Sequence, residues 1–342
     1  MRTVAMLFFL ALAFCPARQP AFAAQPSAGR LLPYPLKGFA VWQEDILRVC
    51  FMRTGEHAVA EVDANGNGCP DFVEDVAKQI LASRDIFHSV VALPDPLHSK
   101  RYSGVRYIDV FLYDSKKMKG SRGMAFDEVS LSREYPLEST GEHSAPRGEP
   151  VKTLVIYCSI GIDPKKNLTP AHEYFHLVQN GISYIKNTWY FEGMAGWSMD
   201  ALGRSWVTRP NMTAQRAKNV LSVLHDTAAR DVLLYASTKI AANKFWKPLA
   251  QLCPEAHITI PVGAPVLRWR YSDGSPVVQD RMIAGAALMR EILYRLGKAD
   301  ERAFAEQAYG KWTEANQRNA LNEAYIFEAI AGAAALCAPG AI

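Results

Sequence analysis

The sequence lacks the features that mark several large classes of protein. Its 38 lysines and arginines are nearly balanced by 34 aspartates and glutamates, which leaves a formal net charge of only +4. Such a balance gives no strong electrostatic field, so nucleic acid or an anionic membrane is not indicated as the main partner. No internal repeat and no long low-complexity tract occurs, and an apolar content of 49% excludes a mostly disordered or collagen-like chain.

The chain also has no apolar run long enough to cross a bilayer, which takes about 20 residues. Residues 4–14 are an apolar run of 11 that follows Arg2 and precedes Ala21-Phe22-Ala23. This order is typical of a cleaved signal peptide. We therefore expect residues 1–23 to be a signal peptide, the mature protein to be secreted or periplasmic, and no transmembrane anchor to be present.

Cysteine is scarce, and no two of the six cysteines stand in a CxxC spacing. A zinc site built from thiolates is therefore not expected. An extracytoplasmic location permits disulfides. Cys158 lies in an apolar segment and is expected to be a buried free thiol. Local proximity and elimination then favour the pairs Cys50–Cys69 and Cys253–Cys337.

The pattern of apolar residues predicts strands early in the chain and helices late. Strand-like segments at 48–53, 105–113 and 153–158 accompany an amphipathic helix over 72–91. Later segments include a hairpin within 258–278, and helices at 170–180, 189–202, 212–229, 237–252, 280–296, 299–312 and 317–336. This order indicates an α+β fold: an N-terminal α/β lobe over 24–165 and a mainly helical lobe over 166–342, together forming one catalytic domain.

One motif concentrates the chemistry, namely Thr169-Pro170-Ala171-His172-Glu173-Tyr174-Phe175-His176. Thr169 suits an N-cap and Pro170 the first helical position, so His172 and His176 lie one turn apart on one helix face. Two imidazoles placed in this way can chelate one Zn²⁺, and Glu173 beside them can deprotonate a metal-bound water. The alternative is two histidines with ordinary partners on a helix surface, which the spacing and the helix start disfavour.

Catalytic zinc usually has three protein ligands, so a third is needed downstream. A metzincin continuation would need Gly and His three and six residues after His176, where the sequence has Gln179 and Ile182. Glu192 is the first candidate, because a second helix could return antiparallel and an unpaired carboxylate is costly in its aromatic setting. Asp200 is the alternative carboxylate.

A second candidate metal site lies at 63–74, where the spacing matches a 12-residue calcium loop position by position. The residues expected to offer oxygen ligands are Asp63, Asn65, Asn67, Cys69 through its backbone carbonyl, Asp71 and Glu74. Hard oxygen donors suit Ca²⁺, and with three charged ligands the affinity is expected in the weak extracellular range of roughly 0.1–1 mM. The alternative is a turn whose polar side chains cap the following helix.

Together these motifs resemble a known class of enzymes. The HExxH helix followed by a glutamate in an E-G-x-A helix is similar to the gluzincin, thermolysin-like class of zinc metallopeptidases. More closely, the chain resembles secreted bacterial zinc metalloproteases that combine four features. These are a signal peptide, a calcium-type loop, an HExxH helix and a helix that carries the glutamate, which here occupy residues 1–23, 63–74, 171–179 and 189–197. The similarity covers roughly residues 45–250. It implies a peptidase fold with the HExxH helix beneath a small sheet, zinc held by His172, His176 and Glu192, and Glu173 as the general base.

The chain departs from that class at one position. Thermolysin-like relatives have an aspartate four residues after the glutamate ligand, which orients a histidine, whereas this chain has Gly196. Asp200 or a backbone carbonyl is therefore expected to take over this task. The oxyanion of the transition state also needs a donor besides the metal, and Tyr235 resembles the tyrosine placed there in related peptidases. The competing donors are Tyr190, His225 and Tyr271.

The sequence thus predicts a secreted zinc metalloendopeptidase that acts on protein or peptide substrates. The main alternative is a secreted, non-catalytic binding or scaffold protein that retains the metalloprotease fold. The intact Glu173 argues against it, since a scaffold that only keeps its metal ligands has no need of the base. A metal-dependent hydrolase of non-peptide bonds is a third possibility.

Overall fold

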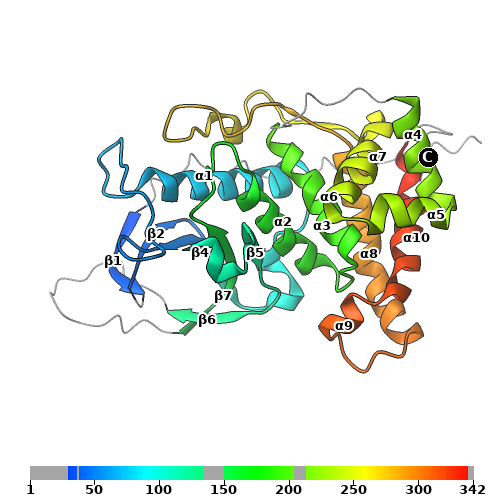
Figure 1. Cartoon of the computed structure of the whole chain (residues 1–342), viewed down its shortest axis with the longest axis horizontal. Helices are drawn as coiled ribbons and strands as arrows, with labels where there is room; N and C mark the ends of the chain where they lie inside the picture. The colour runs from blue at the N-terminus through cyan, green and yellow to red at the C-terminus, as the bar shows by residue number, and fades with distance from the viewer. Residues whose placement is uncertain (1–29, 37, 134–149, 204–212, 338–342) are drawn as a thin grey trace, which may run out of the picture.

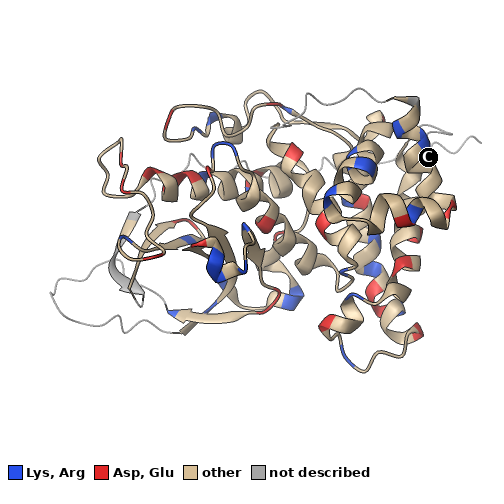
Figure 2. Ribbon diagram, in the orientation of Figure 1, with Lys and Arg blue, Asp and Glu red and all other residues tan. Residues whose placement is uncertain are grey.

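The computed structural model describes residues 30–36, 38–133, 150–203 and 213–337. The expected signal peptide, 1–23, lies outside the described residues. The chain has a mixed α/β fold, with a small N-terminal sheet followed by a helical region (Figure 1). Basic and acidic residues are interspersed along both parts (Figure 2).

Seven strands form one sheet, in which β3, β4 and β7 run parallel and the others are antiparallel to their neighbours. The strands are β1 (Arg30–Leu36), β2 (Phe39–Glu44), β3 (Leu47–Phe51), β4 (Val105–Tyr113), β5 (Gly123–Ala125), β6 (Ser130–Arg133) and β7 (Pro150–Ser159). β5 pairs with residues 156–158 of β7 and β6 with residues 150–153, so these two short strands lie in succession along one edge of the sheet. The three predicted strands are confirmed as β3, β4 and β7.

Two helices pack against the sheet and form the main core with it. They are α1 (Asp71–Asp85), which continues into the π-helical turn η1 (Ile86–Val90), and α2 (Thr169–Ile182). Apolar residues of the sheet such as Val49 and Ile156 lie in the same buried cluster as Val76 of α1 and Phe175 of α2. The predicted amphipathic helix over 72–91 is thus confirmed as α1 with η1, and the HExxH motif lies on a helix that contacts the sheet.

The opposite face of the sheet explains why one predicted disulfide is wrong. Successive side chains of a strand point to opposite faces, so Cys50 lies on the other side of β3 from Val49. Cys50 packs in a separate small cluster with Phe39 and Val41, whereas Cys69 belongs to the main core. Cys50 and Cys69 are therefore free and buried, as Cys158 is. The other predicted pair, Cys253–Cys337, is confirmed.

The region after β7 is mainly helical, as predicted, although several boundaries differ. Its longer helices are α3 (Thr188–Ser198), α4 (Ala214–His225), α8 (Ala286–Glu306) and α10 (Glu323–Ala333). Shorter helical segments are η5 (Met199–Leu202), α5 (Thr227–Arg230), η6 (Asp231–Tyr235), α6 (Thr238–Ala241), η7 (Ala242–Trp246), α7 (Lys247–Leu252) and α9 (Glu314–Gln317). Among the described helices, none is both long and apolar enough to span a membrane.

Two predictions in this region are wrong for identifiable reasons. The helices expected at 280–296 and 299–312 are one helix, α8, because Gly297 does not break it. A Cβ at Gly297 would come within 2.8 Å of the Ile182 carbonyl oxygen, so glycine lets α8 approach the end of α2. The hairpin expected within 258–278 is reduced to an isolated bridge between Arg270 and Pro276, and β8 (Ile258–Thr259) pairs instead with β9 (Met282–Ile283).

Candidate metal centre

The helix that carries the HExxH motif is fixed at its start by a side chain from α1. The sequence predicts Thr169 as the N-cap, but α2 already begins at Thr169 and its capping position has no side-chain hydrogen bond. Instead, the buried amide of Gln79 accepts a hydrogen bond from the Ala171 N–H at 3.0 Å. The same amide donates to the Pro164 carbonyl oxygen at 2.7 Å. One of the unpaired N–H groups at the helix start is thereby satisfied by a residue 92 positions earlier.

His172, His176 and Glu192 converge at the junction of α2 and α3. The Nε2 atoms of the two histidines lie 3.0 Å apart, and Glu192 Oε2 lies 3.3 Å from His172 Nε2 and 3.5 Å from His176 Nε2. In the described ranges, this is the one group of three or more His, Cys, Asp or Glu residues whose ligand atoms lie within 4.8 Å of one another. The structure thus brings together the three ligands predicted for zinc.

The spacing of these three atoms fits a bound metal ion. A tetrahedral ion with bonds of about 2.0–2.1 Å needs ligand atoms roughly 3.3 Å apart, and the three observed separations run from 3.0 to 3.5 Å. The side chain of His176 is 5% exposed, whereas those of His172 and Glu192 are 18% and 35% exposed. The cluster is therefore closed behind His176 and open on the side of Glu192, where a fourth ligand could enter.

The charges within the cluster favour an anionic Glu192. Burial opposes ionisation of Glu192, but hydrogen bonds and charge from His172 and His176 lower its pKa. Burial likewise opposes protonation of His172, while the hydrogen bond and charge of Glu192 raise its pKa above the usual value. The carboxylate is thus held in the anionic state that a metal ligand requires, whereas His172 has to release its proton when a metal ion binds.

Each histidine is oriented by a hydrogen bond on the far side of its ring. His176 Nδ1 lies 2.9 Å from the amide oxygen of Gln179, which can only accept, so Nδ1 carries the proton and Nε2 is left as a ligand. For His172, the backbone of Ala195 raises the pKa of the imidazole, which favours a backbone group, one of the two options predicted, as its orienting partner. Gln179 is an orienting residue that the sequence analysis missed.

The other predicted option, Asp200, lies in η5 and forms an ion pair with Lys247 at 2.9 Å. Gly196, which stands where thermolysin-like relatives have aspartate, has a packing role. A Cβ there would lie 2.7 Å from the Cβ of Ala242, and one at Gly193 would lie 2.4 Å from the Trp246 ring. Both glycines therefore let η7 approach α3 closely, and this contact fixes the helix that carries Glu192.

Comparisons with known proteins do not identify the chain. No family model, no curated protein and no solved structure matches it. The resemblance to gluzincins therefore stays a prediction, and the site has to be interpreted from its own geometry.

The predicted general base, Glu173, is held against the edge of the sheet. Its pKa is raised by burial, with the charges of His176 and His172 acting in the opposite direction. The backbone amide of Ala125 in β5 acts against this rise and lowers the pKa of the carboxylate. A Cβ at Gly123 would lie only 2.6 Å from Glu173 Oε1, so glycine is needed where β5 crosses the side chain. The contact of β5 with Glu173 could not be predicted from the sequence, because no pattern in residues 123–125 indicates it.

The predicted transition-state donor, Tyr235, has its hydroxyl bound elsewhere. It donates at 2.5 Å to Glu323, whose other oxygen accepts from the Trp189 indole at 3.0 Å. Of its competitors, Tyr190 and Tyr271 are buried, being 0% and 2% exposed, and are shielded from a substrate in this conformation. His225 is exposed at the end of α4. The structure thus places none of the four in the metal cluster, and the role of Tyr235 stays a prediction.

The predicted calcium loop forms a compact turn that leads directly into α1. The Asp63 carboxylate accepts hydrogen bonds from the backbone N–H groups of Gly66 and Gly68 at 2.9 and 2.8 Å. The side-chain amides of Asn65 and Asn67 donate to the two oxygens of Glu74 at 3.0 and 2.8 Å.

The remaining predicted ligands of this loop lie close by in the chain. Asp71 accepts from the Ala64 N–H at 3.1 Å, and Cys69 is buried, with its N–H bonded to Asn67. Within the described residues, the carboxylates of Asp63, Asp71 and Glu74 do not form a second group with ligand atoms within 4.8 Å of one another. Calcium binding therefore stays a prediction.

Proposed function

We propose that this chain is a secreted zinc metalloendopeptidase of the gluzincin type. The observation that carries the proposal is the convergence of His172, His176 and Glu192 at separations of 3.0 to 3.5 Å, with Glu173 next to the first ligand on the same helix. Two imidazoles and one carboxylate with an open side form a typical catalytic zinc set. The ion itself, the peptidase activity and secretion through residues 1–23 are parts of this proposal.

Different residues of the chain have different roles in the proposed reaction. Zinc, when bound, would polarise the scissile carbonyl group and lower the pKa of a water molecule. Glu173 accepts a proton from that water and passes it to the leaving amine. β5, which packs closely on the Glu173 carboxylate at Gly123, fixes the direction from which Glu173 acts. Gln179 and the Ala195 backbone hold the two imidazoles in their ligand orientation.

The main alternative is a non-catalytic scaffold that keeps only its metal ligands. In a scaffold Glu173 has no role, whereas in an enzyme it is the general base. Glu173 is buried and its pKa is raised by that burial. A scaffold gains nothing from keeping an ionisable group in such a costly position. A general base, by contrast, works best with a pKa closer to neutral. The state of Glu173 therefore favours an enzyme.

The test compares the mature protein with variants of the base and of one ligand. Wild type and Glu173→Gln should each retain about one zinc per chain, whereas Glu192→Ala should bind it far more weakly. Cleavage of casein or a peptide library should fall by about 10²–10⁴-fold in Glu173→Gln. Metal analysis and the cleavage assay use the same preparations. A wild-type protein that holds zinc yet cleaves neither substrate would contradict the peptidase and favour the scaffold.

We also propose that the loop at 63–74 binds Ca²⁺ and stabilises the junction between the early strands and α1. Its residue spacing supports this. The Glu74 carboxylate faces into the loop, where it accepts from the side-chain amides of Asn65 and Asn67; to bind Ca²⁺, these amides would have to turn their oxygens toward the ion. This site would contribute stability by mass action and would take no part in the chemistry.

A further inference from the structure

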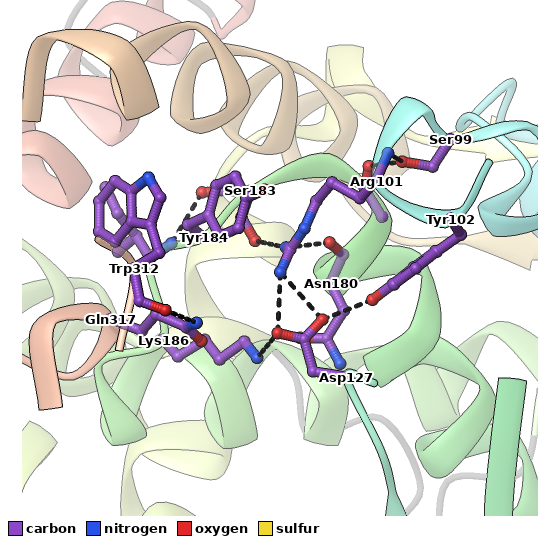
Figure 3. Close-up of polar contacts among 12 residues, drawn as sticks. Ser99, Arg101, Tyr102, Asp127, Asn180, Ser183, Tyr184, Lys186, Trp312 and Gln317 are labelled. Atoms are coloured by element: carbon purple, nitrogen blue, oxygen red, sulfur yellow. Dashed lines mark hydrogen bonds and ion pairs between the residues drawn. The ribbon is translucent and has the colours of Figure 1, made fainter. Parts of the chain in front are cut away.

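One carboxylate, that of Asp127, joins three segments that are far apart in the sequence (Figure 3). Arg101 donates to both of its oxygens, at 3.0 and 2.8 Å. Tyr102 donates to Oδ1 and Lys186 to Oδ2, each at 2.5 Å. Asp127 lies just after β5, Arg101 and Tyr102 form part of the short helix η3 (Lys100–Tyr102), and Lys186 lies in the connection between α2 and α3. We call these four residues the Asp127 cluster.

The cluster is shielded from water and has more cations than anions. The side chains of Arg101 and Lys186 are 12% and 8% exposed, and Tyr102 is buried. Burial lowers the pKa of Lys186, and the charge of Asp127 acts against that shift. Since charge-assisted hydrogen bonds strengthen away from water, Asp127 is the group that makes burial of both cations tolerable. Its removal would leave two partly buried cations without their carboxylate.

On one side the cluster controls the position of β5. Asp127 follows the end of β5 by two residues, and the Phe126 N–H continues the pairing with Val155 at 3.0 Å. β5 in turn packs against Glu173, since a Cβ at Gly123 would lie only 2.6 Å from Glu173 Oε1. The anchor at Asp127 therefore directly follows the strand that packs on the proposed general base.

On the other side the cluster binds the connection between α2 and α3, the two helices that carry the predicted ligands. Arg101 donates to the carbonyl oxygens of Asn180 and Ser183 at the end of α2, and its guanidinium lies 3.7 Å from the centre of the Tyr184 ring. Lys186 Nζ lies 5.8 Å from the centre of the Phe191 ring. That ring stacks on the imidazole of His176 with centres 4.2 Å apart.

From these contacts we infer that Asp127 is a positioning residue, which holds β5 and the α2–α3 connection in one fixed relation. Glu173 depends on the first of these elements, and Phe191 packs behind His176 on the second. The hydrogen bonds and ion pairs of Asp127 among the described residues go to Arg101, Tyr102 and Lys186, so it acts through the two segments that it joins. The expected effect on catalysis rests on the proposed peptidase function, whereas the effect on β5 does not.

The test uses Asp127→Asn, which keeps the size of the side chain and removes its charge. Asp300→Asn is the matched control. Asp300 of α8 holds the same connection from another side, accepting from Ser183 Oγ at 2.8 Å and from the Tyr184 N–H at 2.9 Å. Its hydrogen bonds go to the connection and not to β5. Lys186→Met is a milder variant, because it leaves Asp127 bound to Arg101 and Tyr102.

The first readout is hydrogen–deuterium exchange of the peptide that contains residues 123–127. In Asp127→Asn this peptide should exchange at least about tenfold faster than in wild type, because its anchor is gone. Lys186→Met should show a smaller increase in the same peptide, and this arm decides the matter if Asp127→Asn does not fold. Asp300→Asn should leave exchange of β5 within about twofold of wild type. The inference would be overturned if the 123–127 peptide exchanged no faster in Asp127→Asn than in Asp300→Asn. The same holds for Lys186→Met, should Asp127→Asn not fold.

The second readout is steady-state cleavage of a peptide substrate, with zinc content measured in parallel. Asp127→Asn should keep its zinc and lose at least about tenfold in kcat, with a much smaller change in KM. A loss confined to KM, or an equal loss of kcat in Asp300→Asn, would contradict a positioning role. If the wild-type protein cleaves no peptide at all, the proposed function fails, and the exchange experiment still decides whether Asp127 anchors β5.

Discussion

Replacing Gln179 should weaken zinc binding although Gln179 is not a ligand. Its amide oxygen lies 2.9 Å from His176 Nδ1, and the residue is only 1% exposed. Gln179→Leu keeps the approximate volume but removes the acceptor, so the imidazole loses both its fixed tautomer and its fixed orientation. Substitutions at such orienting positions typically cost 10–100-fold in metal affinity. That range corresponds to about 1.4–2.7 kcal/mol.

Gln179 has a second task, which a second variant separates from the first. Its amide N–H donates to the Phe191 carbonyl oxygen at 3.1 Å and so links α2 to α3. Because the Phe191 carbonyl group also accepts the intrahelical hydrogen bond of α3, losing the bond from Gln179 should cost about 0.5–1.5 kcal/mol. Gln179→Glu keeps an acceptor for His176 but removes this donor. It should therefore retain zinc affinity better than Gln179→Leu, while both variants lower the free energy of unfolding of the metal-free protein.

The assay measures zinc affinity by competition with a chelator at fixed pH. Unfolding of chelator-treated protein in denaturant gives the stability term separately. The reasoning fails if Gln179→Leu binds zinc within about twofold of wild type. It also fails if Gln179→Glu loses as much affinity as Gln179→Leu, since the hydrogen bond to His176 would then not be what matters.

Two further predictions concern stability. Millimolar Ca²⁺ should raise the melting temperature of the wild-type protein through the 63–74 loop, and Glu74→Ala should abolish the increase; an equal increase in Glu74→Ala would refute a calcium site there. In the sheet, Arg48 is 1% exposed and donates two hydrogen bonds to Asp109 at 2.6 and 2.8 Å. Arg48→Met and Asp109→Leu should each cost about 3–5 kcal/mol of unfolding free energy in denaturant titrations, and the double variant should cost much less than their sum. Additive costs would show that the two charges are not coupled.

The metal cluster could be predicted from the sequence because its geometry is mostly local. Histidines four residues apart on a helix share a face whatever surrounds the helix, and a start signal precedes them at Thr169-Pro170. Glu192 was the next carboxylate in a setting where it needed a partner. The structure brings all three side chains together. The identity of the ion and the reaction stay predictions.

The groups that support the cluster could not be predicted, because they depend on tertiary contacts. Gln79 reaches α2 across 92 positions of sequence, and Gly123 of a three-residue edge strand packs against Glu173. Neither contact leaves a periodic or spacing signal. Gln179 is different, because it lies three residues after His176 on the same helix. A hydrogen bond between the two side chains could therefore have been predicted from the motif itself.

The incorrect disulfide and the incorrect hairpin have a common cause. Proximity in sequence favoured Cys50 with Cys69, but the alternation of side chains along β3 sends Cys50 to the face of Phe39 and Val41. Within 258–278, the turn expected at Ser272-Asp273-Gly274 does form, with the Gly274 N–H bonded to the Tyr271 carbonyl oxygen at 2.9 Å. The flanking residues pair no further than the Arg270–Pro276 bridge. The turn is instead held against α1, where Ser272 binds Asp75 through its N–H and its hydroxyl, each at 2.7 Å. In both cases a contact with another element outweighs the local pattern.

The ligand helix α2 is held at both ends by residues that precede it in the chain. At its start Gln79 of α1 accepts from the Ala171 N–H. At its end Ser99 donates to the Gly181 carbonyl oxygen at 2.6 Å, and Arg101 donates to the Asn180 and Ser183 carbonyl oxygens. These are the positions where a helix has unpaired N–H and C=O groups, and the cation at the C-terminal end also suits the helix dipole. The two halves of the chain are therefore not a catalytic unit with an accessory sheet: the ligands lie on α2 and α3, but the early half of the chain fixes the ends of α2 and holds Glu173.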